Sequence, residues 1–389
     1  MRVTHVITRL IVGGAQENTV ATVLGLRDMG LEMQLVSGPT TGPEGSLESI
    51  FDATPGLLSI VPELVRPVHP WKDWIALQKL TRLFRAQRPD VIHTHSGKAG
   101  VLGRLAAHRA GVPLIVHTIH GPSFGAFQGA LPNFVFTAAE KRAARVTTHF
   151  VVVADAMKQQ YLAAGIGQPD QYSRIFSGFD LQPYLCAADD AKLRAKWGLE
   201  PKDIVIGKIA RLFKLKGHDD LIAIAPEIVR EHPRVKFLLV GDGAWRKRFE
   251  HAVASASLRG HFVFTGLVAP TEIPALVGIM DMLVHLSRRE GLPRALPQAL
   301  AAGRPVVAYD CDGAGEVCIP HETGFLVPPG DKARLTSSLL QLTRDAELRQ
   351  RLGQRGQAFV RAHFGVELMV ERIHSLYMKL AAERGLCPA

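Results

Sequence analysis

Two basic residues, Arg211 and Lys216, lie five positions apart where an apolar run ends and a helical pattern begins. Across such a turn both side chains can point at one ligand. Arginine binds phosphate through two parallel hydrogen bonds, and lysine adds a compact positive charge. A diphosphate leaving group needs this neutralisation while its bond breaks. We therefore predict a diphosphate site at this turn; two solvated surface cations are the alternative.

Glu290 lies in a polar loop that follows the apolar run Met282–His285. Pro293 suits the first turn of a following helix, because its missing N–H costs nothing there. Gly303 suits the end of that helix, and the next apolar run starts soon after it. The free N–H groups and the positive end of the helix favour an anion. We expect Glu290 and this helix end to face the same ligand as the two basic residues.

Glycine-rich turns follow two other apolar runs, at Gly13-Gly14 and at Gly241-Asp242-Gly243. Glycine lets the backbone approach a ligand closely, and a helix start offers N–H groups to an anion. A plain strand–helix turn explains each of them equally well. The complete GxGxxG motif is absent from the first turn, so a nicotinamide site is not supported.

The composition indicates a globular protein of more than one domain. The chain has 389 residues, of which 47% are hydrophobic and 21% charged, and a chain of this length ordinarily divides into domains. The net charge is +10, and residues 81–145 hold nine Lys or Arg against two acids. A basic face attracts phosphates, nucleic acid or an anionic membrane, although a solvated helix face is the alternative. No RNA-binding signature or recognition helix accompanies it, so nucleic acid is not an expected partner.

Metal-binding and targeting signals are weak. The four cysteines lack zinc-type spacing, and we interpret them as free thiols in a reducing cytoplasm. They are Cys186, Cys311, Cys318 and Cys387. Asp310 and Asp312 have the spacing of a metal-binding pair, but we expect no metal there. No leader precedes the first apolar run and no run approaches the ~20 residues that cross a bilayer, so we expect a cytoplasmic protein, free or peripheral on the inner face of the membrane.

Short apolar runs alternate with helix-length amphipathic segments along the chain. Such runs are typical of parallel strands buried on both faces of a sheet. The first series of predicted strands is Val3–Ile7, Met33–Ser37, Val91–Thr94, Leu114–Ile119, Phe150–Val153 and Ser173–Phe176. The second is Val205–Ile209, Lys236–Val240, Phe262–Thr265, Met282–His285, Val306–Tyr309 and Phe325–Val327. Predicted helices between them include Gln16–Met29, Trp74–Ala86, Gly217–Arg230 and Ala333–Leu342.

Two series of six strands predict an α/β fold with two Rossmann-like, doubly wound domains. Their expected limits are residues 1–180 and 190–365, with a linker near Ser177–Asp190. The last helical pattern, about 366–384, has no strand after it, and we expect it to pack back on the first domain. Ligands of such sheets bind at the carboxyl ends of the strands, so two facing sheets would form a central cleft.

Taken together and in order, these motifs resemble those of the retaining glycosyltransferases of family four. The segment from Glu290 to Val307 is similar to their EGxPxxLxEAxAxGxPV region, and Arg211 to Gly217 to their GRLxxxKG element. Further matches are Gly13-Gly14, Ser177-Gly178-Phe179-Asp180, Gly241-Asp242-Gly243, Gly315-Glu316 and Thr323–Val327. The motifs are specific as an ordered set that runs through most of the chain.

The resemblance implies a GT-B fold and transfer of a sugar from a nucleotide diphosphate donor with retention. The second domain would bind the donor, with a UDP-sugar favoured, and the first would bind a glycan, a lipid-linked or a small-molecule acceptor. No cofactor or metal is implied, because protein cations would neutralise the diphosphate. Retention without a carboxylate nucleophile implies attack on the front face, where the departing phosphate takes the proton of the acceptor.

The resemblance also implies roles for particular residues. Arg211 and Lys216 would hold the diphosphate, and Glu290 would contact the donor sugar together with nearby backbone N–H groups. The implied catalytic residues are His120, Arg211, Lys216 and Glu290. The implied donor-binding residues are Gly13, Gly14, Arg211, Lys216, Gly241, Glu290, Gly291, Leu292 and Gln298.

Gln298 stands where the family has a glutamate that binds the ribose hydroxyls. A glutamine amide still hydrogen-bonds a diol but brings no charge. His120 ends the run Leu114–Ile119 and is similar to the family's first-domain histidine, which would contact the donor sugar or the transition state. A strand-end histidine bonded to backbone is the alternative. The other histidines nearby are interpreted as structural: His93, His95 and His117.

The stretch 124–145 combines aromatic with basic residues. The apolar members are Phe124, Phe127, Leu131, Phe134, Val135 and Phe136, and the basic ones are Lys141, Arg142 and Arg145. This combination suits a lipid interface. We predict peripheral membrane contact and a lipid-linked acceptor; a helix that packs these aromatics in a core is the alternative.

Two other functions share these features. A nucleotide-sugar epimerase or a sugar phosphorylase would use the same phosphate-binding cations, but an epimerase needs no acceptor and a phosphorylase needs free phosphate. A non-catalytic nucleotide-sugar-binding protein is suggested by Gln298, and it would bind the donor without turnover.

Overall fold

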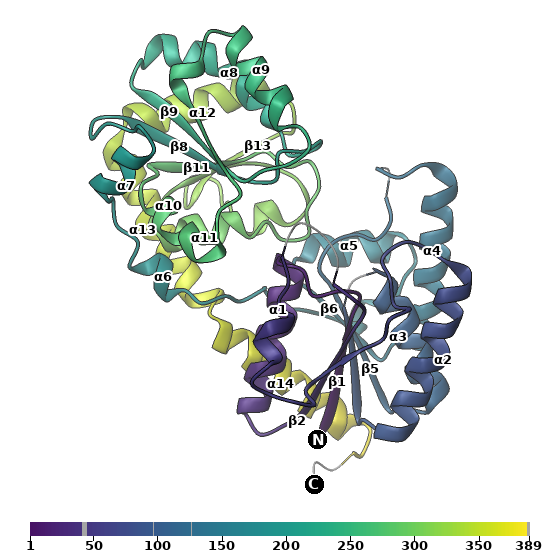
Figure 1. The fold of residues 1–389 in the computed structure, drawn as a ribbon. Helices are drawn as coiled ribbons and strands as arrows, with labels where there is room; N and C mark the ends of the chain where they lie inside the picture. Colours follow the sequence, from purple (N-terminus) through teal and green to yellow (C-terminus); the bar gives the residue numbers. More distant parts are fainter. Residues whose placement is uncertain (41–44, 96, 126, 387–389) are drawn as a thin grey trace. The chain divides into compact units, whose positions relative to one another are not determined.

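The computed structural model describes residues 1–40, 45–95, 97–125 and 127–386, and it divides the chain into two compact units (Figure 1). The first unit comprises Met1–Phe179 and Val366–Ala389, and the second comprises Asp180–Gly365. Each unit is built around one parallel β-sheet with helices on both of its faces. This is the Rossmann-like α/β architecture that the sequence predicts.

The sheet of the first unit has seven parallel strands in the order β3-β2-β1-β4-β5-β6-β7. The strands are β1 (Arg2–Ile7), β2 (Glu32–Ser37), β3 (Leu58–Ile60), β4 (Val91–His95), β5 (Leu114–Ile119), β6 (His149–Val152) and β7 (Tyr172–Arg174). The order of the strands reverses between β1 and β4, which makes the sheet doubly wound. Ligands of such sheets bind beside this reversal, at the carboxyl ends of the strands.

The strand β3 was not among the six that the sequence predicts for this sheet. It has only three residues, pairs with β2 at the edge, and leaves Ile60 exposed. A short strand that is covered on one side needs no continuous apolar run, so hydrophobic patterning does not reveal it. The predicted series of six strands was therefore one strand short.

Two helical layers cover this sheet, and alternate residues of its strands point into them. The helices of the unit are α1 (Gly14–Asp28), α2 (Pro70–Gln87), α3 (Gly97–Ala110), α4 (Ala130–Ala144), α5 (Asp155–Ala163) and α14 (Val366–Glu383). Val3 and Ile7 of β1 pack with α1 and α14, whereas Val6 packs with α2 and α3. The C-terminal helix α14 buries Ile373 and Tyr377 in the core of the first unit.

The sheet of the second unit has six parallel strands in the order β10-β9-β8-β11-β12-β13. The strands are β8 (Ile204–Ile209), β9 (Val235–Val240), β10 (Phe262–Gly266), β11 (Met282–His285), β12 (Val306–Tyr309) and β13 (Gly324–Val327). All six were predicted, with ends that differ by one residue at most. The reversal of strand order falls between β8 and β11, so the carboxyl ends of these two strands are the expected ligand position.

Helices cover this second sheet on both faces as well. They are α6 (Gln182–Leu185), α7 (Ala191–Lys196), α8 (His218–Glu231), α9 (Arg246–Ser255), α10 (Ile273–Gly278), α11 (Ala295–Ala301), α12 (Lys332–Arg344) and α13 (Ala346–His363). Ile206 of β8 and Val284 of β11 are fully buried in the core of this unit, together with Leu221 and Ile228 of α8.

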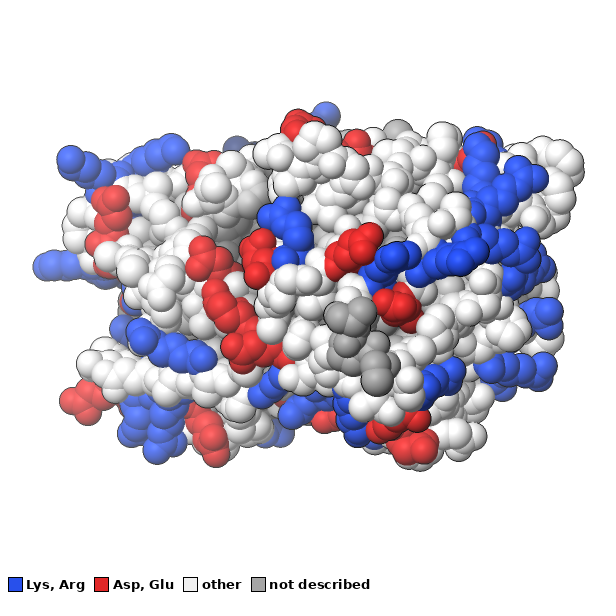
Figure 2. Space-filling view, turned by 90° about the horizontal axis from the view of Figure 1, so that it is seen from below, with Lys and Arg blue, Asp and Glu red and all other residues white. Residues whose placement is uncertain are grey.

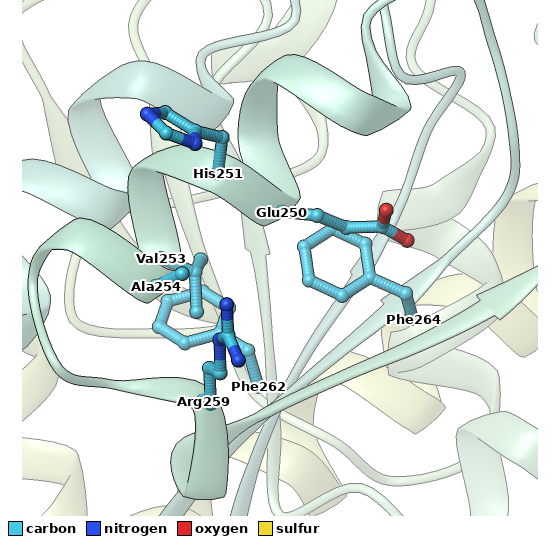
Figure 3. A pocket seen from close by; sticks show the side chains of 7 residues that line it. All are labelled: Glu250, His251, Val253, Ala254, Arg259, Phe262 and Phe264. Atoms are coloured by element: carbon cyan, nitrogen blue, oxygen red, sulfur yellow. The ribbon is translucent and has the colours of Figure 1, made fainter.

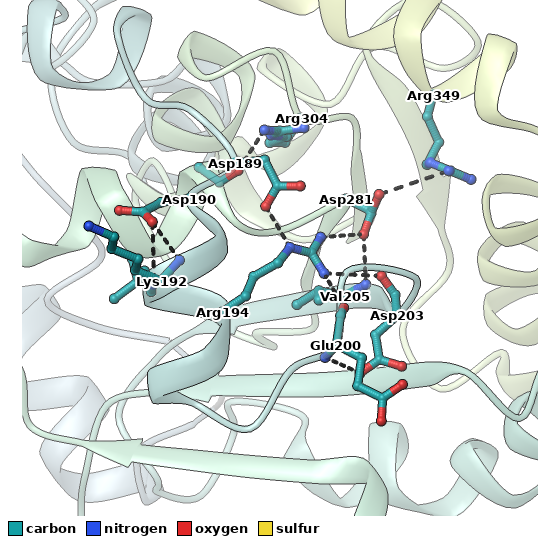
Figure 4. A network of polar contacts seen from close by, with 12 residues as sticks. Asp189, Asp190, Lys192, Arg194, Glu200, Asp203, Val205, Asp281, Arg304 and Arg349 are labelled. Carbon is teal, nitrogen blue, oxygen red and sulfur yellow. Dashed lines mark hydrogen bonds and ion pairs between the residues drawn. The ribbon is translucent and has the colours of Figure 1, made fainter.

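A network centred on Arg194 fastens the start of the second unit to its sheet (Figure 4). Arg194 Nε donates to Asp189 Oδ1 at 2.5 Å, and its Nη1 donates to the carbonyl oxygens of Glu200 and Asp203 at 3.2 Å each. Its Nη2 lies 3.6 Å from Asp281 Oδ2. Because the Arg194 guanidinium is 5% exposed and has partners on several sides, the buried charge is compensated.

The cysteines Cys186, Cys311 and Cys318 are free thiols, as predicted. Burial raises the pKa of the Cys311 and Cys318 thiols to about 12, which keeps them protonated and unreactive. Cys387 lies outside the described residues.

Candidate functional site

Lys216 and Glu290 meet at the carboxyl ends of the two central strands of the second unit. Lys216 ends the loop between β8 and α8, and Glu290 lies in the loop that follows β11. The Lys216 ammonium forms an ion pair with Glu290 Oε1 and lies 3.3 Å from Ser287 Oγ. The two residues are 74 positions apart in the sequence. They become neighbours because β8 and β11 pair with each other in the sheet.

Glu290 is held as a carboxylate. Burial by itself would raise its pKa, but the neighbouring His285 ring and the charge of Lys216 outweigh burial and hold the pKa well below its ordinary value. His285 Nε2 lies 3.5 Å from Glu290 Oε1. Glu290 is therefore an acceptor of hydrogen bonds at neutral pH and does not serve as a proton donor.

Backbone contacts keep the Glu290 loop in place. The N–H of Glu290 donates to Asp312 Oδ2 at 2.7 Å, and the N–H of Gly313 donates to the carbonyl oxygen of Gly291 at 3.0 Å. The N–H of Arg288 donates to the carbonyl oxygen of Leu215 at 2.9 Å and so joins this loop to the one that carries Lys216. Asp312 thus positions the loop, which is a role that the sequence did not reveal.

Gly217 allows the two loops to come this close. Its φ is +70°, and a Cβ at this position would lie 2.2 Å from the carbonyl oxygen of Leu286. Both the left-handed backbone and the lack of space exclude a side chain here. The glycine that follows Lys216 is therefore required by the approach of the β8–α8 loop to the end of β11.

An uncompensated cation lies buried beneath this ion pair. Lys208 of β8 is 1% exposed, and its Nζ has no hydrogen-bonding partner among the described residues. Burial, and then the charge of Lys216, lower the pKa of Lys208 to about 7. The sequence signal was available, since Lys208 interrupts the apolar run Ile204–Ile209, but it was not recognised.

His218 in the first turn of α8 shares this environment. It is 1% exposed, its ring stacks on Phe249 with 4.9 Å between centroids, and neither ring nitrogen has a partner in the described part of the chain. Burial and the charges of Lys208 and Lys216 lower its pKa to about 2. The group Lys208, Lys216, His218, His285 and Glu290 is called the cation cluster below.

Arg211 begins the loop that Lys216 ends, and its side chain is exposed. The turn Gly241–Gly243 packs against this loop, because the N–H of Leu212 donates to the carbonyl oxygen of Asp242 at 3.0 Å. A Cβ on Gly241 would lie 2.4 Å from the carbonyl oxygen of Ala210. The glycine thus makes room for the backbone of the chain itself, which favours the plain turn over the predicted space for a ligand.

The helix after Glu290 begins later than predicted. It spans Ala295–Ala301, so Pro293 precedes the helix instead of forming its first turn. The carbonyl oxygen of Pro293 accepts a hydrogen bond from the N–H of Leu296, three residues further on, at 3.1 Å. The prediction that Gly303 ends the segment is confirmed: its φ is +69°, and the two N–H groups at Gly303 and Arg304 bond back to the helix.

Gln298 lies in this helix and already has a partner within the second unit. Its Nε2 donates to the hydroxyl oxygen of Tyr184 in α6 at 2.6 Å. A glutamate at this position would instead accept the hydroxyl proton of Tyr184. The difference at residue 298 therefore reverses a hydrogen bond and does not merely remove a charge.

The predicted site residues of the first unit lie at the carboxyl ends of its central strands. Gly13 is the cap of α1 and Gly14 its first residue, and the N–H of Glu17 donates to the carbonyl oxygen of Gly13 at 2.9 Å. His120 follows β5 and is half-buried. Its Nε2 lies 3.0 Å from Nδ1 of His95, so its bond is to another histidine and not to the backbone of the strand end.

The alternative of a core-packed helix in 124–145 is wrong, because most of its apolar side chains are exposed. Leu131 is 74%, Phe134 71% and Val135 50% exposed, whereas Phe124 before the helix is buried. The buried residues of α4 are Glu140 and Ala143. Glu140 pairs at 2.5 Å with Arg104 of α3, which is fully buried. An internal ion pair therefore holds α4 and leaves its apolar face uncovered.

Two tryptophans are exposed on another helix of the same unit. Trp71 and Trp74, in the first turns of α2, are 65% and 52% exposed, and their rings stack at 5.3 Å. The helix α3 contacts both α2 and α4. Its Lys98 pairs with Asp73 of α2 at 2.6 Å. The exposed apolar residues of α4, of α2 and of the segment before α2 are together called the aromatic surface below: Val68, Trp71, Trp74, Leu131, Phe134 and Val135.

Basic side chains are exposed at the other ends of the same two helices. Lys141, Arg142 and Arg145 are exposed at the end of α4. The exposed arginines of α2 and the residues after it include Arg82, Arg85 and Arg88. In Figure 2, Lys and Arg lie at both ends of the visible face, one of which is on the side where Figure 1 places α2. No helix in the described ranges is both long and apolar enough to cross a membrane.

A shallow hollow in the second unit lies apart from these residues (Figure 3). Its volume is about 380 Å³, and it is lined by α9, the edge strand β10 and the turn between them. Its lining residues are Glu250, His251, Val253, Ala254, Arg259, Phe262 and Phe264. None of them belongs to the predicted site or to the cation cluster.

Two family models match the chain. The model described as glycosyl transferases group 1 matches residues 189–359, and the model described as glycosyl transferase 4-like domain matches residues 13–175. Together they match most of both units.

Named relatives match over most of their length. The UDP-Gal:alpha-D-GlcNAc-diphosphoundecaprenol alpha-1,3-galactosyltransferase of Escherichia coli is 26% identical, over 99% of this chain and 98% of its own. The 2-deoxystreptamine glucosyltransferase of Streptomyces kanamyceticus is 31% identical, over 80% of this chain and 83% of its own.

A solved structure has the same fold. Anabaena HepE in complex with UDP matches with a TM-score of 0.82 at 22% identity, over 97% of this chain and 100% of that chain. At this level of identity the likeness establishes the architecture, with two Rossmann-like units of the GT-B type.

Proposed function

The chain belongs to the glycosyl transferases group 1 family and is a glycosyltransferase with a nucleotide-sugar donor, and we propose that it transfers a hexose from a UDP-sugar, with retention, to a lipid-linked glycan. The observation that carries this proposal is the cation cluster at the carboxyl ends of β8 and β11. An epimerase or a phosphorylase is not favoured, because the named relatives transfer sugars to acceptors.

The cation cluster suits the diphosphate of the donor. Lys216 lies at the surface of the cluster, and Arg211 lies on the same loop. Lys208 adds positive potential when it is protonated, because its Nζ has no hydrogen-bonding acceptor among the described residues. A diphosphate gains negative charge as the sugar leaves, and preorganised cations stabilise that charge in the transition state. We propose that these residues neutralise the diphosphate, as a bound metal ion does in other transferases.

Glu290 and His120 suit the sugar. The Glu290 carboxylate is fixed by Lys216 and by its own backbone, so it can accept hydrogen bonds from sugar hydroxyls, with the N–H groups of Gly291 and Leu292 beside it. Because Glu290 is ionised and already paired, we assign it a binding role and not that of a nucleophile. The acceptor then attacks the front face, and the departing phosphate takes its proton. His120 is proposed to contact the donor sugar.

A thermal-shift assay with nucleoside diphosphates tests the donor site. A ligand that binds only the folded protein raises its melting temperature by mass action. In EDTA, UDP should raise the melting temperature of the wild type, and Lys216→Ala and Arg211→Ala should each abolish the rise. Lys214→Ala is the matched control, because Lys214 is an exposed lysine of the same loop. A rise that survives Lys216→Ala, or that requires added magnesium, would contradict the proposed site.

The aromatic surface supports the lipid-linked acceptor. Exposed Trp and Phe side chains on helices that also carry exposed Lys and Arg can bind at a membrane interface, through apolar burial and attraction to anionic headgroups. The E. coli relative acts on an acceptor that carries diphosphoundecaprenol. We propose that the aromatic surface rests on an anionic membrane and brings the first unit to a sugar held there by its lipid diphosphate.

Vesicle co-sedimentation tests this contact. The protein should sediment with vesicles that contain phosphatidylglycerol and remain in solution with neutral vesicles. The double variant Trp71→Ser/Phe134→Ser should lose binding about tenfold or more, since two large apolar side chains leave the interface. Phe213→Ser is the control, because Phe213 is 51% exposed on the second unit. Equal binding of both variants would rule out the aromatic surface as the contact.

A further inference from the structure

Four histidines, one tyrosine and one threonine form a continuous hydrogen-bonded chain in the first unit. It starts at Thr118, whose Oγ1 lies 2.6 Å from His93 Nε2, and continues from His93 Nδ1 to the Tyr377 hydroxyl at 2.5 Å. The same hydroxyl lies 3.1 Å from His5 Nε2.

The second half of the chain leads to the predicted site. His5 Nδ1 lies 2.9 Å from His95 Nε2, and His95 Nδ1 lies 3.0 Å from His120 Nε2. The strands β1, β4 and β5 and the helix α14 all contribute a member, and Tyr377 comes from 372 positions beyond His5. Both ring nitrogens of His5, His93 and His95 are therefore occupied within the chain.

The imidazoles in the chain are neutral at physiological pH. Burial lowers the pKa of His5 to about 3, and it lowers the pKa of His93 and His95 well below the ordinary value. Burial also lowers the pKa of His120 to about 4. The same effect raises the pKa of Tyr377, which keeps its hydroxyl protonated. Each imidazole thus carries one N–H donor and one bare nitrogen acceptor.

If the Tyr377 hydroxyl donates one of its two bonds and accepts the other, only two orders of donors and acceptors satisfy every link with one proton on each ring. If the hydroxyl accepted both bonds, its own buried proton would be left without an acceptor, which is unfavourable. In the first, Thr118 donates to His93, and each member donates to the next until His95 donates to His120. In the second, every bond is reversed, and His120 donates to His95. The two orders leave opposite tautomers at His120: Nδ1–H in the first and Nε2–H in the second.

The buried hydroxyl of Thr118 selects between the two orders. Thr118 is 3% exposed, and His93 Nε2 is the one hydrogen-bonding partner of its hydroxyl in the described part of the chain. In the second order this hydroxyl only accepts, so its own proton is buried without an acceptor. An unpaired buried donor is unfavourable, so the first order is favoured. In it, every hydroxyl and N–H inside the chain has an acceptor.

We propose that this chain locks His120 as the Nδ1–H tautomer, so that His120 offers a hydrogen-bond donor to the sugar and is not a general base. His95 is the positioning residue in contact with it, and Tyr377 is a remote one. The effect on catalysis rests on the proposed function, in which His120 contacts the donor sugar. The tautomer of His120 does not depend on the proposed function.

The ring nitrogens are already engaged, which disfavours the other use of three histidines, a metal site. Ligand atoms of His5, His93 and His95 lie within 4.8 Å of one another. However, both ring nitrogens of each of these residues already have a hydrogen-bonding partner in the chain. A metal ion would need the same in-plane lone pairs and would have to displace these bonds.

The ring ¹⁵N shifts of His120 test the proposal, because they distinguish a protonated from a bare nitrogen at each position. The wild-type protein, labelled at histidine, should show His120 protonated at Nδ1. Tyr377→Phe cuts the chain and leaves an unpaired atom in either order, so the Nε2–H form of His120 should appear. Tyr172→Phe is the matched control, because its buried hydroxyl donates to the carbonyl oxygen of Ile166 outside the chain; it should change nothing at His120.

His95→Leu provides a second variant that does not depend on α14. It removes the partner of His120, and the Nδ1–H preference should be lost. With a UDP-sugar and an acceptor, Tyr377→Phe should lower kcat by about three- to tenfold, the value of one hydrogen bond, and leave the KM for the donor unchanged.

Three results would overturn the proposal. They are an Nε2–H tautomer at His120 in the wild type, His120 shifts that ignore both variants, and one equivalent of tightly bound metal that is lost in His95→Leu. If no donor supports transfer, the proposed function fails, while the tautomer measurement still decides whether the chain acts on His120.

Discussion

Two buried polar groups lie at corresponding places in the two units, and they differ in how well they are satisfied. In the histidine chain of the first unit, both ring nitrogens of His5, His93 and His95 have a partner. In the cation cluster of the second unit, Lys208 Nζ and both ring nitrogens of His218 have none among the described residues. Both groups lie beside the reversal of strand order, where ligands of this fold bind.

The histidine chain is suited to positioning a residue, whereas the cation cluster is suited to binding a ligand. A closed network of hydrogen bonds is rigid, because the loss of any member leaves another buried group unpaired. An open cluster keeps unmet charge, which is unfavourable in the free protein but favourable when an anion arrives. We therefore expect variants of the histidine chain to lose stability, and a variant that removes the unpaired Lys208 to lose ligand binding while stability holds or rises.

The largest expected effect is on catalysis, from Lys216→Ala. The change removes the cation nearest the proposed diphosphate and leaves Glu290 with His285 alone. We expect kcat to fall by about 10²–10³, as for the loss of one charge-stabilising group, with Lys214→Ala near wild type. Steady-state kinetics with a UDP-sugar measure both. Equal losses in the two variants would mean that net charge matters and position does not.

Tyr377→Phe should have the largest effect on stability. It removes the hydroxyl that joins His93 to His5 and leaves a buried atom of each unpaired. We expect the free energy of unfolding to fall by about 1–3 kcal/mol, as measured by urea denaturation. Tyr172→Phe again serves as the reference. A Tyr377→Phe protein as stable as the wild type would show that the chain does not bear on the fold.

Lys208→Met should act in the opposite direction. Methionine has a similar shape and no charge, so it removes a buried cation that has no partner. We expect stability at pH 7 to rise by about 1–2 kcal/mol, while the affinity for UDP falls about tenfold or less. Calorimetry and denaturation on one preparation would measure both. A variant that loses stability would show that Lys208 is satisfied within the folded protein.

The pH dependence of stability gives an independent check on Lys208. Its pKa is about 7 in the folded protein against 10.5 ordinarily, so the unfolded chain binds more protons between these values. Stability therefore rises with pH across this window, by at most about 1.4 kcal/mol per pH unit from this group. In Lys208→Met that part of the rise should be absent. If the curves of stability against pH ran parallel for the wild type and Lys208→Met, they would contradict the lowered pKa of Lys208.

The smallest effect is expected from Gln298→Glu. Tyr184 would then donate to the new carboxylate, so the contact survives with its direction reversed. We expect UDP affinity to change by less than about tenfold, in favour of glutamate if residue 298 binds the ribose. The rise in melting temperature on adding UDP, measured for the wild type and for Gln298→Glu, tests this. A loss of binding in Gln298→Glu would indicate that the glutamine is an adaptation to a different donor.

Much of the fold could be predicted because buried parallel strands leave a strong signal. The six strands of the second sheet were predicted to within one residue at each end. The three-residue edge strand β3 was missed, since it is half covered and lacks a continuous apolar run. The exposure of Phe134 could not be read from the sequence either. It depends on the buried ion pair between Glu140 and Arg104, which holds α4 without using its apolar face.

Part of the candidate site was predictable because the strands that carry it were predictable. Residues in the loops after β8 and β11 must come together once their strands pair, so the types and positions of Lys216 and Glu290 were sufficient. The packing of Gly241 against Ala210 was not, because a glycine gives the same signal whether a ligand or the backbone fills the space beside it.

The sequence by itself determined the α/β class, the strands that carry the site, and the charged residues at their ends, because these depend on local periodicity and on neighbours in the chain. Only the tertiary structure decided which buried polar atoms find partners. Lys208 and His93 both interrupt apolar strands and look alike in the sequence. Lys208 Nζ is left without a hydrogen-bonding partner among the described residues, whereas His93 is bonded at both nitrogens. A hydrogen bond requires a second group within about 3 Å, and helix α14 supplies one to His93 through Tyr377.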